Sequence, residues 1–151
     1  MKIRAAAEGD REALLAMTGR MYAEHAGFPF TFDPAAARSV LATQLTSKLC
    51  AMFIAEDGGG VFGFCSAQLK MPDRRFTMDG RLGRIADIYV EPDARKGGVA
   101  RALLRAAEDW LREHGATLIE CDVMGNNAAG NAFWSKMGYG ELAVLRSKKI
   151  L

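Results

Sequence analysis

The sequence predicts a single α/β domain covering residues 1–151. Apolar segments of strand length alternate along the chain with segments whose apolar residues recur at helical spacing. The clearest helical segment, 99–113, follows an apolar strand and a glycine-containing loop. No internal repeat, low-complexity tract or linker-like stretch divides the chain. A length of 151 residues suits one domain with a full hydrophobic core.

The N-terminal region predicts one short strand and two helices. A strand is expected at 2–5, followed by a helix over 10–25 with one apolar stripe. Asp33 is expected to cap a second helix that begins at Pro34, since Asp is a preferred N-cap and Pro is tolerated in the first turn. The side chains of this helix that are expected to face the core are Val40, Leu41 and Leu45.

A strand pair and a loop are expected next. Strands at 51–55 and 61–69 surround the turn sequence Asp57-Gly58-Gly59-Gly60, which is typical of a hairpin. The following segment, 71–81, is rich in Pro, Asp and Arg and is expected to form a longer loop.

The C-terminal half predicts three strands and two helices. We expect strands at 84–90, 117–123 and 141–150, with the main helix at 99–113. A short helix is expected after Asn127. The buried face of the main helix is predicted to consist of Val99, Leu103, Ala107, Trp110 and Leu111.

Composition narrows the classes of protein. The net charge of +2 is too small to indicate a nucleic-acid or membrane surface, and no apolar run reaches membrane-spanning length. Cys50, Cys65 and Cys121 have neither disulfide nor zinc spacing, and His25 and His114 are too far apart to indicate a metal site. The start of the chain lacks a secretory apolar region. We therefore expect a cytoplasmic protein with reduced cysteines and no metal.

The segment 88–101 carries the strongest functional signal. An apolar strand ends at Pro92, and a basic loop with the glycine pair Gly97-Gly98 leads directly into the main helix. Glycines let a ligand approach the backbone, and the first turn of a helix presents unpaired N–H groups with a partial positive charge. The loop is therefore suited to hold a phosphate or pyrophosphate. The Lys-Ser/Thr pair of a nucleotide-triphosphate loop and the three spaced glycines of a dinucleotide loop are both missing.

The spacing Arg95-x-x-Gly98-x-Ala100 resembles the coenzyme A loop of the GNAT superfamily of N-acetyltransferases. A second block, 127–139, is similar to another landmark of the superfamily, in which an Asn precedes an aromatic pair and a Lys/Arg-x-Gly-aromatic ending. Its matching residues are Asn127, Phe133, Trp134, Lys136, Gly138 and Tyr139. The resemblance implies a three-layer α+β fold, with a central mixed, mostly antiparallel sheet whose central strands splay apart between flanking helices.

The resemblance also implies acetyl-CoA as cofactor, bound between the strands at 84–90 and 117–123. Backbone contacts would come from the end of the first of these strands, and pyrophosphate contacts from the loop and the first helical turn. Asn127 would hydrogen-bond the pantetheine arm, and Phe133 and Trp134 would line its wall, although core packing is an equal interpretation of Phe133. The remaining expected cofactor-binding residues are Ile88, Tyr89, Val90, Arg95, Lys96, Gly97, Gly98, Val99, Ala100 and Arg101.

The implied reaction is attack of an amine on the thioester, and here the sequence departs from the family pattern. Many relatives have Tyr as general acid where this chain has Trp134, and Glu or His where it has Ala86. Asp87 is the nearest remaining acid in that strand and is our candidate catalytic residue. Glu120 and Asp122 are further candidates, for which a solvated or salt-bridged role is the simpler interpretation.

The pocket for the amine substrate is expected in the aromatic segment 22–33 and at the ends of the strands in the C-terminal half of the chain. The candidate substrate-binding residues are Tyr22, Glu24, Phe28 and Asp122. The expected acceptor is a primary amine of a small molecule or peptide, and a homodimer is left open. Two alternatives remain: a non-catalytic acyl-CoA binding or sensing module, and, less favoured, a nucleotide-binding switch protein.

Overall fold

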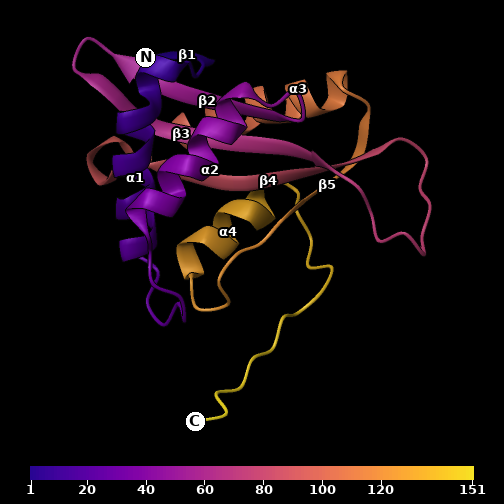
Figure 1. Ribbon diagram of the computed structural model, residues 1–151. Helices are drawn as coiled ribbons and strands as arrows, with labels where there is room; N and C mark the ends of the chain where they lie inside the picture. The colour runs from indigo at the N-terminus through magenta and orange to yellow at the C-terminus, as the bar shows by residue number, and fades with distance from the viewer.

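The computed structural model describes all 151 residues, and a five-stranded sheet forms its centre (Figure 1). The strands are β1 (Lys2–Ala5), β2 (Cys50–Asp57), β3 (Gly60–Lys70), β4 (Arg81–Val90) and β5 (Ala116–Cys121). They lie side by side in sequence order; β1 to β4 pair antiparallel, and β5 pairs parallel to β4. The parallel pair is possible because α3 crosses over between β4 and β5.

Helices cover both faces of the sheet. The four helices are α1 (Arg11–Ala23), α2 (Pro34–Thr46), α3 (Val99–Glu113) and α4 (Ala128–Lys136). In Figure 1, α1 and α2 lie on one face of the sheet and α3 lies on the other. Short 3-10 turns at Glu8–Asp10 and Pro92–Ala94 precede α1 and the loop before α3. No helix is long and apolar enough to cross a membrane.

The core has one part on each face of the sheet. On the α3 side, the fully buried Leu103, Ala107 and Leu111 pack against Cys65 and Ile85. On the other side, α1 and α2 bury their apolar residues against β2, β3 and β4. That cluster consists of Leu14, Leu15, Met17, Met21, Leu41, Met52, Ile54, Phe64 and Tyr89. Because α3 packs against all five strands, it fixes where the loop at its N-terminus lies relative to the end of β4.

Most elements agree with the sequence-based expectations, and the fold class is confirmed. The predicted helix 99–113 has the predicted bounds, and Asp33 caps α2 by accepting hydrogen bonds from the N–H groups of Ala35 and Ala36 at 3.0 and 3.2 Å. The expected inward orientation of Val40 is wrong. Its side chain is 55% exposed, because α2 buries only a narrow stripe around Leu41.

The predicted closing strand at 141–150 is also wrong. The chain after Tyr139 forms neither helix nor strand, and Figure 1 shows it leading away from the sheet. Tyr139 itself is fixed, since its N–H donates to the carbonyl of Trp134 at 3.0 Å. A strand needs a neighbouring sheet edge to satisfy its backbone groups, and residues 141–151 have no such neighbour within this chain.

Candidate functional site

The loop between β4 and α3 presents a row of unpaired backbone N–H groups. None of the six N–H groups from Lys96 to Arg101 donates a hydrogen bond within the chain. Gly98 is the N-cap of α3 and adopts a left-handed conformation with φ +82°, and Lys96 also has a positive φ of 67°. A Cβ added at Gly98 would meet no atom within 4 Å, so the surface here is open. Such a loop at the positive end of a helix dipole fits a phosphate group.

Beside this loop, β4 and β5 separate. Their paired residues run from Arg81 and Ala116 to Ile85 and Cys121, and the last residues of β4 pair only with β3. Polar backbone groups on the β5 side of this end of β4 therefore lack a sheet partner, as the predicted splayed strands require. The anion-binding loop and the free strand end lie next to each other along the chain, so one extended ligand can contact both.

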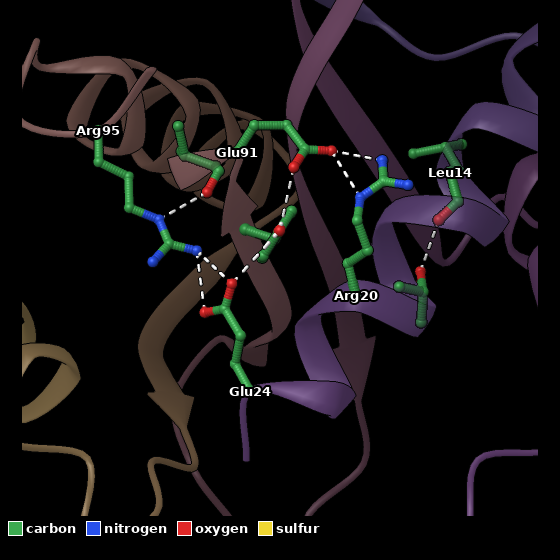
Figure 2. A network of polar contacts seen from close by, with 8 residues as sticks. Leu14, Arg20, Glu24, Glu91 and Arg95 are labelled. Atoms are coloured by element: carbon green, nitrogen blue, oxygen red, sulfur yellow. Dashed lines mark hydrogen bonds and ion pairs between the residues drawn. The ribbon is translucent and has the colours of Figure 1, made fainter. Parts of the chain in front are cut away.

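Arg95 connects the loop to the C-terminal end of α1. Its Nε donates to the carbonyl of Val90 at 2.8 Å, and its Nη2 contacts both carboxylate oxygens of Glu24 at 2.8 and 2.9 Å (Figure 2). The guanidinium also lies over the ring of Tyr89. The predicted substrate-binding residue Glu24 is thus ion-paired to the predicted cofactor-binding residue Arg95.

Tyr89 and Glu91 extend this network, and Figure 2 shows Glu91 facing Arg20. The Tyr89 hydroxyl is 3.1 Å from Glu91 and 3.4 Å from Glu24, and Glu91 pairs with Arg20 of α1. Burial and the neighbouring carboxylate of Glu91 raise the pKa of Tyr89. The Tyr89 side chain is in the core, so only its backbone is placed to contact a ligand.

Asp87 lies on the α1 side of β4 with two hydroxyl neighbours. The Tyr22 hydroxyl donates to Oδ1 and the Ser66 hydroxyl to Oδ2, each at 3.4 Å, while the Asp87 N–H donates to the Ser66 oxygen at 3.0 Å. Burial raises the pKa of Asp87, and the hydrogen bonds from Tyr22 and Ser66 partly oppose this shift. A carboxylate that binds a proton more readily than usual is suited to accept one from an ammonium group.

Sequence reasoning missed Ser66. The only available signal was a polar residue within the apolar run Phe64-Cys65-Ser66-Ala67, and a strand residue of this kind has no chemical motif around it. The pairing of β3 with β4 brings Ser66 opposite Asp87, and this contact depends on the sheet register.

The segment between α1 and α2 forms an aromatic cluster next to Asp87. The Tyr22 ring lies 5.3 Å from that of Phe28 and 5.9 Å from that of Phe32, and Phe32 packs close to Gly19 of α1. The Nδ1 atom of His25 is buried here without a hydrogen-bond partner. The structure thus brings two predicted acceptor residues, Tyr22 and Phe28, together beside the predicted catalytic carboxylate.

Asp122 and Glu120 belong to an ion-pair cluster. Arg84 of β4 pairs with Asp122 and lies 3.7 Å from Glu120, which is also 4.0 Å from Lys70. Glu120 and Asp122 are therefore both salt-bridged in this structure, as the simpler of the two interpretations expected. Asp122 remains an exposed carboxylate at the end of β5.

The second sequence block forms α4. The Asn127 side chain caps this helix by accepting the Gly130 N–H at 2.9 Å, while its amide nitrogen makes no hydrogen bond within the chain and can serve a ligand. Trp134 is buried in the core, and its ring packs edge-on against Phe133 and Tyr139. The Tyr139 hydroxyl donates to Glu108 at 2.7 Å, and burial raises the pKa of Tyr139.

Two surface hollows lie away from Asp87 and from the loop before α3. One, of about 310 Å³, is lined by residues of the 71–82 region together with Leu49 and Leu69, and the other, of about 540 Å³, lies between the β2–β3 turn and residues 91–94. Neither is lined by Asp87 or by residues 95–101. No group of His, Cys, Asp and Glu side chains could hold a metal ion, and the three cysteines are unpaired.

Together, the unpaired N–H groups of the loop and the separating ends of β4 and β5 are suited to an extended, phosphorylated ligand. The family model of the acetyltransferase (GNAT) family matches residues 19–139, which is most of the chain. The chain therefore belongs to the GNAT acetyltransferase family, as the two sequence blocks predicted.

Curated relatives carry the names of several acetyltransferases. A mycothiol acetyltransferase of Amycolatopsis mediterranei is 34% identical over 87 residues, covering 58% of this chain and 29% of the relative. An aminoglycoside N(6')-acetyltransferase type 1 of Klebsiella aerogenes is 32% identical over 93 residues, covering 62% of this chain and 60% of the relative. The chain thus spans less than two thirds of the length of these relatives.

Solved structures share the whole fold. The aminoglycoside N-acetyltransferase AAC(6')-Iy in complex with CoA superposes with a TM-score of 0.82 at 20% identity, covering 99% of this chain and 95% of that chain. The 6'-N-acetyltransferase AAC(6')-IG of Acinetobacter haemolyticus gives a TM-score of 0.79 at 24% identity, covering 99% of both chains. At these identities the likeness establishes the fold.

Proposed function

We propose that this protein is an acetyl-CoA-dependent N-acetyltransferase that acts on a primary amine. The observation that carries the proposal is the row of six unpaired N–H groups from Lys96 to Arg101 beside the unpaired end of β4. Membership of an acetyltransferase family supports the same reaction.

The residues present fit coenzyme A. The loop N–H groups and the basic side chains of Lys96 and Arg101 would hold the pyrophosphate, and the backbone of Ile88 and Val90 would pair with the pantetheine arm. The Asn127 amide nitrogen would donate a further hydrogen bond. Bound acetyl-CoA supplies an acetyl group activated as a thioester.

Asp87 would prepare the acceptor amine. A primary amine in water has a pKa of about 10 and is mostly protonated at neutral pH, so a group in the site must accept a proton before the nitrogen can act as a nucleophile. The Asp87 carboxylate lies beside the aromatic cluster of Tyr22 and Phe28, where an ammonium group would be attracted to it. Tyr22 and Ser66 hold the carboxylate in place.

The acceptor is proposed to be a cationic amine of a small molecule or peptide. Relatives named for aminoglycosides, mycothiol and the alanine of ribosomal protein bS18 span this range. The carboxylates of Asp87, Glu120 and Asp122 favour a substrate with positive charge, although Arg84 offsets part of their field. A cytoplasmic location is supported by the three unpaired cysteines, and a homodimer by the free outer edge of β5.

A non-catalytic acyl-CoA binding module is the second candidate. Two observations favour it: position 86 is Ala, and Trp134 is packed in the core and has no acidic proton. Positioning alone can still supply much of the acceleration of an acyl transfer. Activity is therefore the property that separates the two candidates.

The test has two stages. Calorimetric titration with acetyl-CoA, with CoA and ATP as comparisons, is expected to show binding of the two coenzyme A compounds and not of ATP. Acetyl transfer is then measured on an aminoglycoside, an amino sugar and a peptide N-terminus by release of free thiol. Binding without transfer to any amine would favour the second candidate, and absence of binding would exclude both.

A further inference from the structure

The segment that follows α1, residues 24–28, is held by two side-chain contacts that come from different connections. The Glu24 carboxylate pairs with Arg95 in the loop after β4 (Figure 2). Two residues further along, the Ala26 carbonyl accepts a hydrogen bond from Nδ2 of Asn126 at 2.9 Å. Asn126 belongs to the connection between β5 and α4. The segment is therefore joined to the chain beyond β4 and to the chain beyond β5.

These are the two strands that separate. β4 and β5 pair only as far as Ile85 and Cys121, and the proposed cofactor site is the opening beyond these residues. Because one contact comes from each side of this opening, residues 24–26 span it on the side of α1. Asp87 faces the same side of the sheet, since its carboxylate accepts a hydrogen bond from Tyr22 of α1. An amine bound at Asp87 would therefore lie against this segment.

The contacts within the segment restrain it weakly. Its internal hydrogen bonds are those of short turns, such as the bond from the Phe28 N–H to the His25 carbonyl. The His25 ring packs against the rings of Tyr22 and Phe28, but its Nδ1 is buried without a hydrogen-bond partner. A buried polar atom without a partner costs free energy, so this packing alone does not secure the segment. The contacts made by Arg95 and Asn126 supply the missing restraint.

The position of the segment determines how the acceptor side of the site is built. The ring centroids of His25 and Phe28 each lie 5.3 Å from that of Tyr22, whose hydroxyl donates to Asp87 at 3.4 Å. A shift of Ala26, which lies between His25 and Phe28 in the chain, therefore moves the rings that surround Tyr22.

We propose that Asn126 is a positioning residue for the acceptor amine, a role that rests on the proposed acetyltransferase function. Its hydrogen bond to Ala26 holds the aromatic cluster beside Asp87. The next residue, Asn127, is the one that would hold the pantetheine arm, so the β5–α4 connection serves both substrates. Asn126 contacts the amine only through the segment that it holds. It therefore affects the affinity for the amine and leaves the affinity for acetyl-CoA unchanged.

The first experiment is steady-state kinetics with whichever of the aminoglycoside, amino sugar and peptide the wild-type protein acetylates fastest. Asn126→Ala removes the donor and is expected to raise KM for the amine about tenfold, which is the effect of losing one hydrogen bond, with a smaller change in kcat. The Kd of acetyl-CoA, from calorimetry, is expected to stay at the wild-type value. Asn126→Gln keeps a carboxamide donor and is expected to recover most of the wild-type KM.

Thr117→Val is the matched control. The Thr117 hydroxyl also donates from an exposed side chain to the backbone carbonyl of a distant residue, Asp79, at 2.6 Å. Thr117 lies near the start of β5, at the end of the strand away from the opening. Its substitution removes a contact of the same kind and is expected to leave KM for the amine unchanged.

The second experiment needs neither cofactor nor amine. Amide hydrogen exchange at residues 25–28 is expected to be about tenfold faster in Asn126→Ala than in the wild-type protein, because the hydrogen bond that restrains the segment is lost. Exchange at the same residues should be unchanged in Thr117→Val. Unchanged exchange in Asn126→Ala would overturn the proposal, because the segment would then be held without Asn126.

The kinetic results can overturn it in three further ways: a wild-type KM for the amine in Asn126→Ala, no recovery in Asn126→Gln, or an equal loss of acetyl-CoA affinity. The last result would mean that Asn126 supports the whole β5–α4 connection. If the wild-type protein binds acetyl-CoA but acetylates no amine, the proposed function fails and the positioning role fails with it. Acetylation by the wild-type protein together with an unchanged KM in Asn126→Ala removes the positioning role alone.

Discussion

Arg95 and Glu24 form a two-pronged ion pair that joins the cofactor loop to the end of α1, with Nη2 at 2.8 and 2.9 Å from the two carboxylate oxygens. The two residues are 71 positions apart in the sequence. The pair places the carboxylate of Glu24, a candidate substrate-binding residue, next to the loop that would hold a pyrophosphate.

Glu24→Gln is expected to tighten acetyl-CoA binding up to about fivefold, because it removes a negative charge near the anion site and releases the Arg95 guanidinium. The measurement is calorimetric titration with acetyl-CoA. Glu12→Gln, which breaks the exposed pair with Arg38, is the matched control and should leave the affinity unchanged. A raised KM for the amine with unchanged acetyl-CoA affinity would instead support the substrate-binding role expected from the sequence.

Gly98→Glu is expected to abolish acetyl-CoA binding, since its carboxylate would occupy the anion site. Gly98 has a positive φ, so any side chain also strains the backbone there. Gly98→Ala carries the same strain without the charge and is therefore the control for calorimetry. Equal binding by the Glu and Ala variants would refute the loop assignment.

Asp87→Asn is expected to lower kcat/KM for the amine by about 10²–10⁴-fold and to remove the acidic limb of the pH–rate profile. Asp93→Asn, an exposed residue near the loop, serves as the comparison. The idea fails if the rate and the profile of Asp87→Asn match those of the wild-type protein.

The same substitution has an opposite effect on stability. Because burial raises the pKa of Asp87, the folded state binds this proton more tightly than the unfolded state. This stabilisation is fully present at a pH below the pKa that Asp87 has in the unfolded chain. It is lost as the pH rises through the pKa that Asp87 has in the folded protein. At neutral pH the buried carboxylate destabilises the fold, so Asp87→Asn should have an equal or higher Tm at pH 7. A marked drop in Tm would show that the charge is needed for folding.

Tyr22→Phe is expected to move the acidic limb of the pH–rate profile to higher pH. The Tyr22 hydroxyl lowers the pKa of Asp87 by hydrogen bonding to it, and Phe removes the bond while keeping the ring contacts with Phe28 and Phe32. Tyr139→Phe, whose hydroxyl contacts Glu108, should leave the limb in place. If the acidic limb of the pH–rate profile of Tyr22→Phe stays at the wild-type pH, Tyr22 does not influence the carboxylate that reacts.

Trp134→Ala is expected to destabilise the protein by about 3–5 kcal/mol, because it empties a buried position between Phe133 and Tyr139. Urea unfolding followed by circular dichroism measures this change. A loss below about 1 kcal/mol would contradict the core position of Trp134 and favour an exposed role at the cofactor wall.

The position of the glycine-containing loop before α3 could be predicted because its signal is local. Glycine spacing, the strand end at Pro92 and the amphipathic pattern of 99–113 all lie within a short stretch of chain, and the structure places them as expected. The side-chain contacts around Asp87 could not be predicted in this way. Ser66 and Tyr22 come from distant positions, and sheet register and helix packing bring them to one carboxylate.

The prediction of a strand at 141–150 was wrong for the same reason, because strand formation also depends on a distant segment. Its sequence has a strand-like apolar content, but a strand exists only where a second edge accepts its hydrogen bonds. The sequence by itself determined the family, the order of the elements up to α4 and the position of the loop before α3, because these depend on residues close together in the chain. Only the tertiary structure decided that Glu24 pairs with Arg95, that Trp134 packs in the core and that β5 keeps a free edge, because these depend on how distant segments meet.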